Sequence, residues 1–197
     1  GGQRRREGCR MSPAEAPPGA TGVVLDAPWL ADPAVRAVLD ALDGRACFVG
    51  GCVRNALMGR GGTDIDLATA LRPEEVVAAL EAAGLRAVPT GIEHGTVTAV
   101  AEGQGIEITT FRADVETDGR RAVVRFTDDM AEDARRRDFT MNALYADARG
   151  RVLDPLGGLG DLRAGRVRFI GRAEDRIRED YLRILRFYRF TAWYGTG

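Results

Sequence analysis

The chain has 197 residues, with 28 basic against 29 acidic side chains and 45% hydrophobic positions. These values are typical of a soluble globular protein with one core, or a core plus part of a second unit. Every basic residue is an arginine, which excludes a lysine-dependent phosphate loop and a Schiff base. A single serine, a single histidine and three unpatterned cysteines argue against a serine hydrolase, a structural zinc site and a disulfide framework. The cysteines favour the reducing cytoplasm, and no apolar run is long enough to cross a membrane.

Residues 1–22 are rich in glycine, proline and arginine, as in a disordered tail. Apolar periodicity then predicts helices at 32–42, 52–58, 73–83, 138–144 and 174–194. Alternating or short apolar runs predict strands at 45–49, 63–69, 85–89, 96–101 and 106–111, and a hairpin from 144–147 and 151–153. The polar stretch 113–132 is expected to be a mobile loop. This order predicts an α/β (α+β) head with a mixed sheet, followed by the start of a helical region, in a truncated chain.

Two carboxylates stand on the predicted strand 63–69. Asp64 and Asp66 are two residues apart, so on a strand their side chains project from the same face. Paired carboxylates repel each other and need a cation or a proton. Mg²⁺, which takes oxygen ligands together with substrate phosphates, suits such a pair. The alternative is the solvated face of a half-buried strand.

A glycine pair separates the strand 45–49 from the next helix. Gly50 and Gly51 let backbone N–H groups approach a phosphate, and Arg54 can add a charge-assisted contact. An ordinary tight turn with a surface arginine is the alternative.

Two further charged residues are candidates for the same site. Glu107 lies opposite the apolar face of the strand 106–111, where it can complete a carboxylate trio or remain a solvated strand residue. Three consecutive arginines at 135–137 repel one another and would be stabilised by phosphate, unless they form a solvated surface. The junction with the apolar segment that follows favours Arg137 as the one that points inward.

The last predicted helix carries charged residues every three positions: Asp180, Arg183, Arg186 and Arg189. The large apolar side chains around them predict a mostly buried helix, so this stripe is expected to line a polar groove. Aspartate and arginine together can recognise a base edge as well as phosphates. A salt bridge between Asp180 and Arg183 that stabilises the helix is the alternative.

These motifs together resemble the tRNA nucleotidyltransferase and poly(A) polymerase family, in the class with a polymerase-β-like head. The resemblance covers roughly residues 45–194 and runs through the motifs GGCVRNALMG, DIDLAT, HGTVTAV, IEITTFR, RRRDFTMNALY, DPLGGLGDL and REDYLRILRFYRF. It implies a nucleotidyltransferase head at 23–168 and the start of a helical, RNA-binding neck at 169–197.

The activity implied is the addition of CCA to the tRNA 3′ end from CTP and ATP, with release of pyrophosphate. Residue by residue, the resemblance implies that Asp64 and Asp66 hold two Mg²⁺ ions. It also implies that Gly51, Arg54 and Arg137 bind the nucleoside triphosphate.

In the neck, the resemblance implies that Asp180 and Arg183 hydrogen-bond the incoming base, while Arg186 and Arg189 support this pocket and the phosphates. One departure is Asn55, where the family usually has an aspartate. Alternative activities are poly(A) synthesis or the addition of only CC or only A. A non-catalytic nucleotide- or RNA-binding module is the alternative from another class.

Overall fold

The computed structural model describes residues 19–62, 64–115 and 123–196. Most of the predicted tail at 1–22 lies outside these residues. The strands are β1 (Ala20–Val24), β2 (Ala46–Val49), β3 (Asp66–Thr69), β4 (Arg86–Gly91), β5 (Thr96–Ala101), β6 (Gln104–Thr110), β7 (Arg112–Val115), β8 (Val123–Phe126), β9 (Tyr145–Ala146) and β10 (Arg151–Leu153). The α-helices are α1 (Pro33–Ala41), α2 (Gly51–Leu57), α3 (Pro73–Ala82), α4 (Met130–Arg135), α5 (Gly158–Arg163), α6 (Ala173–Glu179) and α7 (Leu182–Tyr194), and the 3-10 turns are η1 (Pro28–Ala31), η2 (Ile92–His94) and η3 (Thr140–Asn142).

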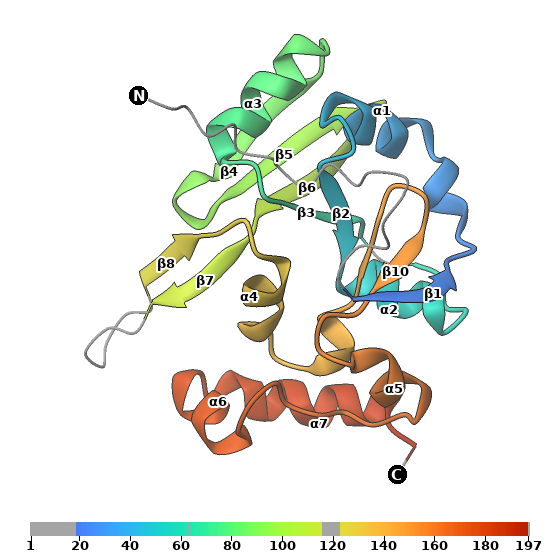
Figure 1. Ribbon diagram of the computed structural model, residues 1–197, viewed down its shortest axis with the longest axis vertical. Coiled ribbons are helices and arrows are strands. Elements are labelled where there is room, and N and C mark those ends of the chain that lie inside the picture. The colour runs from blue at the N-terminus through green and yellow to red at the C-terminus, as the bar shows by residue number, and fades with distance from the viewer. Residues whose placement is uncertain (1–18, 63, 116–122, 197) are drawn as a thin grey trace.

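Eight strands form one mixed sheet in the order β1-β10-β9-β2-β3-β6-β5-β4 (Figure 1). Its described neighbours pair antiparallel except β3 and β6, which run parallel and place Asp66 directly opposite Glu107. The mixed sheet with helices confirms the fold class predicted from the sequence. β1, which pairs with β10, was not expected.

The two faces of the sheet are covered by different helices. Leu67 joins the larger core, which includes Val38 of α1 and Leu80 of α3. Its neighbour Ala68 joins a second cluster with Ala134 of α4. Figure 1 shows α4 between the sheet and α7. Because side chains alternate along a strand, Asp66 lies on the α4 side.

The strand predicted at 63–69 is shorter than expected. β3 begins at Asp66, so Asp64 precedes the strand instead of belonging to it. The reason lies in β2, which ends at Val49 and turns into α2 at Gly50, leaving Asp64 without a strand partner on that side. Thr63 lies outside the described residues.

The prediction of a mobile loop at 113–132 is wrong for the part of this range that the structure describes. β7 and β8 form a hairpin in which Arg112 is opposite Phe126, and α4 begins at Met130. The backbone N–H of Thr127 donates to the carbonyl oxygen of Phe111 at 2.9 Å, which closes this unit against the sheet. Hydrogen bonding to distant residues therefore overrides the weak local pattern.

Two helices predicted from the sequence, at 138–144 and 174–194, also differ from those in the structure. The segment 138–144 contains only the 3-10 turn η3, because the N–H of Thr140 donates to the carbonyl oxygen of Arg168 at 3.0 Å instead of continuing a helix. The helix predicted at 174–194 breaks at Asp180, whose backbone is extended and whose carboxylate accepts the N–H of Leu182 at 2.9 Å. Asp180 therefore ends α6 and starts α7, as expected for an aspartate that competes with the helix backbone.

The expectation of a mostly buried last helix is also wrong for the described chain. Leu182, Leu185, Tyr188 and Trp193 are all exposed on α7, and among the described residues of this helix only Phe190 and Tyr194 are buried.

Candidate active site

The carboxylates predicted from the sequence meet at one cavity. A cavity of about 410 Å³ is lined by Val35, Asp64, Ile65, Asp66, Gln104, Gly105, Ile106 and Glu107. Asp66 and Glu107 belong to neighbouring strands in register, so their side chains leave the sheet on the same face. Asp64 reaches the cavity from the segment before β3. The structure therefore brings together the three predicted acids, although only one of the aspartates is a strand residue.

The charged form of Asp66 is disfavoured in this cavity, first by burial and then by its acidic neighbours. Burial, followed by the charges of Glu107 and Asp64, raises the pKa of Asp66 to about 6, while Arg137 opposes this shift. A carboxylate whose charge is so disfavoured gains from a bound cation. Within the described ranges, no three acidic, histidine or cysteine side chains lie close enough to hold a metal ion by themselves. The hard oxygen donors of Asp64 and Asp66 fit Mg²⁺, which completes its shell with water and phosphate.

Arg137 is held on the α4 side of the sheet by a buried acid. Its Nε and Nη2 donate to Oδ2 of Asp133 at 3.2 and 2.9 Å, and the hydroxyl of Tyr145 donates to the same oxygen at 2.7 Å. Asp133 is 1% exposed. Burial acts to raise the pKa of Asp133, but the charge of Arg137 and the Tyr145 hydrogen bond hold it below the ordinary value. This ion pair fixes the guanidinium near the carboxylates.

A glycine keeps the space beside Arg137 open. Gly50 has φ +73°, a backbone conformation that residues other than glycine rarely adopt. A Cβ added there would lie 3.7 Å from Nη1 of Arg137, and that nitrogen donates no hydrogen bond within the described part of the chain. Gly50 and Gly51, which opens α2, therefore border a guanidinium edge that is free to bind an anion.

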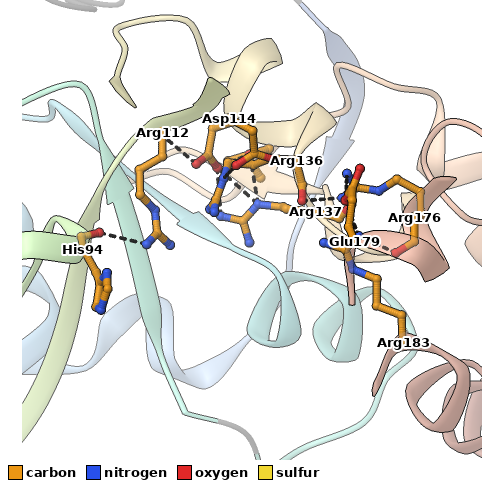
Figure 2. Close-up of polar contacts among 10 residues, drawn as sticks. His94, Arg112, Asp114, Arg136, Arg137, Arg176, Glu179 and Arg183 are labelled. Carbon is orange, nitrogen blue, oxygen red and sulfur yellow. Dashed lines mark hydrogen bonds and ion pairs between the residues drawn. The ribbon is translucent and has the colours of Figure 1, made fainter. Parts of the chain in front are cut away.

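Further arginines surround this position. Burial and then the charge of Arg136 lower the pKa of Arg112, and Arg137 acts in the same direction. The Nη1 of Arg112 donates to the carbonyl oxygen of His94 at 2.8 Å, and Nε of Arg136 donates to Asp114 at 3.1 Å (Figure 2). The result is a cluster of cations that neighbouring acids only partly neutralise.

Arg54 has a different environment from the one that the sequence predicts. It is 7% exposed, and its guanidinium donates to Asn55 and Asn142 and to the hydroxyl of Tyr194 at 2.8 Å. The Tyr194 ring centroid is 4.3 Å from its guanidinium carbon. Arg54 does not line the carboxylate cavity; it connects α2 to η3 and α7. Its predicted contact with triphosphate stays a prediction.

The four charged neck residues do not form a single stripe. Asp180 is exposed at the break between the two helices. The Nη1 of Arg183 donates to Glu179 and to the carbonyl oxygen of Arg176. The sequence gives no direct signal for Glu179, because a glutamate at a helix end is common on surfaces.

The remaining two arginines of α7 have other partners. The Nε of Arg186 donates to Oδ2 of Asp138 at 2.8 Å, which links α7 to the segment after α4. Arg189 lies over the rings of Phe190 and Trp193. The salt bridge between Asp180 and Arg183, which was the alternative to a polar groove, is absent from the ion pairs of the described residues, where Glu179 pairs with Arg183 instead.

The site combines a mixed sheet, paired carboxylates and an arginine anchored by a buried acid. A sequence profile described as the poly A polymerase head domain matches residues 46–168, which is more than half of the chain. The chain therefore belongs to the poly(A) polymerase head domain family. This membership confirms the resemblance seen in its motifs.

Relatives in this family carry CCA addition in their names. The chain is 50% identical over 149 residues to a CCA-adding enzyme of Streptococcus pyogenes, covering 75% of this chain and 36% of that protein. It is 46% identical over 144 residues to the mitochondrial CCA tRNA nucleotidyltransferase 1 of Danio rerio, covering 73% and 33%. The chain thus spans about a third of the length of these relatives.

Solved structures show the same fold. The Bacillus stearothermophilus CCA-adding enzyme in complex with CTP superposes with a TM-score of 0.70 and 38% identity, covering 81% of this chain and 39% of that one. A tRNA nucleotidyltransferase complexed with a primer tRNA and an incoming ATP analog superposes with a TM-score of 0.60 and 30% identity, covering 78% and 43%. Among the described helices of this chain, none is long and apolar enough to span a membrane.

Proposed function

We propose that this chain provides the nucleotidyltransferase head, residues 23–168, and the first neck helices, from residue 169, of an enzyme that adds CCA to the tRNA 3′ end. The observation that carries the proposal is the placement of Asp64, Asp66 and Glu107 around one cavity with Arg137 anchored nearby. The names of the relatives support CCA addition over poly(A) synthesis or partial addition.

In the proposed reaction, the tRNA 3′-hydroxyl attacks the α-phosphorus of CTP or ATP. A bond forms between the 3′-oxygen and the α-phosphorus, and the bond from the α-phosphorus to the oxygen that bridges it to the β-phosphorus breaks. Pyrophosphate leaves, and the hydroxyl proton passes to solvent. Phosphoryl transfer depends mainly on positioning and electrostatic stabilisation. The absence of lysine from the sequence is therefore no obstacle.

The residues of the head have distinct tasks. Asp64 and Asp66 would hold two Mg²⁺ ions, which when bound lower the pKa of the attacking hydroxyl and neutralise the leaving charge. Because its pKa is about 6, Asp66 is mostly ionised at neutral pH and can bind a cation. Arg137 binds the triphosphate through its open edge beside Gly50. Glu107 supports the two aspartates by increasing the negative potential at the cavity.

The neck residues would select the base. Asp180 and Arg183 present acceptors and donors to the base edge, and Arg186 and Arg189 support that pocket. Since Asp180 is exposed, its carboxylate can turn toward a base without breaking a buried contact. We place the reaction in the cytoplasm, because the three cysteines of the sequence show no disulfide pattern.

The test is incubation of the full-length protein with tRNA that lacks its 3′ CCA and with each nucleoside triphosphate in turn. We expect CTP addition first, then ATP addition, and no growth beyond three nucleotides. A long adenylate tail would support poly(A) synthesis instead. Triphosphate binding without incorporation would support a binding module.

A further inference from the structure

Arg176 differs from the other arginine of α6, Arg178, because it is buried. It is 8% exposed, whereas the side chain of Arg178, two positions further on the same helix, is 74% exposed. The Nη2 of Arg176 donates to the carbonyl oxygens of Arg136 and Arg137 at 2.6 and 2.8 Å. Its Nη1 donates to Oε2 of Glu179 at 2.7 Å (Figure 2). A buried cation with three acceptors on two sides is a structural connection, not a solvated charge.

The first side of this connection is the backbone that carries Arg137. The carbonyl groups of Arg136 and Arg137 directly follow the end of α4, where the helix no longer supplies them with donors. One guanidinium nitrogen of Arg176 satisfies both. The position of this backbone decides where the open edge of Arg137 lies relative to Asp66.

The second side is Arg183. Glu179 accepts hydrogen bonds from both Arg176 and Arg183. The backbone carbonyl of Arg176 also accepts from Nη1 of Arg183 at 2.8 Å. Arg176 therefore holds Arg183 through its side chain, by way of Glu179, and through its own backbone. Figure 2 shows these residues as one continuous set of contacts from α4 to α7.

We propose that Arg176 is a positioning residue that sets the distance between the triphosphate contact at Arg137 and the base contact at Arg183, so that base selection depends on it. The inference rests on the proposed function, because it assigns those two contacts to nucleotide binding. A planar guanidinium suits this task because its donors are fixed in one plane, whereas a lysine ammonium has no such fork. Arg176 itself need not touch the nucleotide.

The experiment compares Arg176→Gln, Arg176→Lys and Glu179→Gln with the wild type, all as full-length protein with tRNA that lacks its 3′ CCA. Arg178→Gln is the matched control, since this exposed residue of the same helix pairs, among the described residues, only with Asp175, at 3.6 Å. The readouts are kcat and KM for CTP and ATP, incorporation of UTP and GTP, and the unfolding midpoint. Glu179→Gln alters a half-exposed side chain, so this variant keeps the test informative if Arg176→Gln fails to fold.

We expect Arg176→Gln and Glu179→Gln to reduce the preference for CTP over UTP by about tenfold, the effect of one lost charge-assisted hydrogen bond. Arg176→Lys should not restore the preference, and Arg178→Gln should retain it. Unchanged preference in Glu179→Gln and the Arg176 variants, with only a lower unfolding midpoint, would overturn the inference while leaving the proposed function intact. A wild-type protein that incorporates no nucleotide would overturn both.

Discussion

Replacing Asp133 by asparagine should destabilise the fold and displace Arg137. The Asp133 carboxylate is buried and receives Nε and Nη2 of Arg137, the Tyr145 hydroxyl and the backbone N–H of Arg112. Asparagine has nearly the same volume, but it removes the charge that neutralises the arginine. Breaking a buried ion pair from one side costs about 3–5 kcal/mol. Tyr145→Phe removes the hydrogen bond donated to Asp133 and the longer one accepted from Arg137, but it retains the ion pair and should cost about 1.5–3 kcal/mol.

The pH dependence gives an independent check. The pKa of Asp133 is lower in the folded protein than its ordinary value of 3.8. Its contribution to the free energy of unfolding is therefore complete above the ordinary value and is lost as the pH falls through the folded pKa. Urea denaturation of wild type and Asp133→Asn should show a difference that is large at about pH 7 and smaller at about pH 3. Equal stability at neutral pH, or a difference that does not change with pH, would refute this account of the ion pair.

Three other predictions concern the remaining parts of the site. Asp66→Asn should abolish nucleotide incorporation, yet stabilise the metal-free fold by about 1–2 kcal/mol at neutral pH after allowance for solvent screening. The reason is that a raised carboxylate pKa means that the charge of Asp66 opposes folding above that pKa. Reduced stability of the variant in calorimetry without metal would contradict this. Tyr194→Phe should lower the free energy of unfolding by about 1.5–3 kcal/mol through its bond to Arg54, measured by denaturant titration, and a neutral effect would show that this contact contributes nothing. Arg183→Ala should relax base selection by about 1–3 kcal/mol in competition assays, whereas uniform loss of activity with unchanged preference would exclude a base contact.

The carboxylate part of the site could be predicted from the sequence because its signals are local. The alternation of apolar residues around Glu107 places that acid opposite the core, and the two-residue spacing of Asp64 and Asp66 keeps both near one strand. The parallel register that sets Asp66 against Glu107 has no such signal, because it depends on a crossover between distant segments.

The cationic part was harder to predict because its partners come from other elements. Asp133 is an ordinary polar residue of a short segment until α4 packs on the sheet and Tyr145 of β9 reaches its carboxylate. The burial of Arg54 depends in the same way on α7 returning to α2, which places Tyr194 over its guanidinium. Local pattern also cannot show that Asp180 prefers to cap α7 instead of extending a longer helix.

The parallel pairing of β3 with β6 has a consequence for the order in which the protein folds. β5 and β6 are joined by a tight turn at Glu102 and Gly103, both with positive φ, so this hairpin can form early from local contacts. Strands β3 and β6 are separated by α3, β4 and β5. Their pairing requires closure of that whole segment, so the entropy cost of closure precedes the stabilising contacts between the two strands. We therefore expect Asp66 and Glu107 to meet late, after the hairpin and α3 have formed. Repulsion between the two acids is then opposed by a core that already exists.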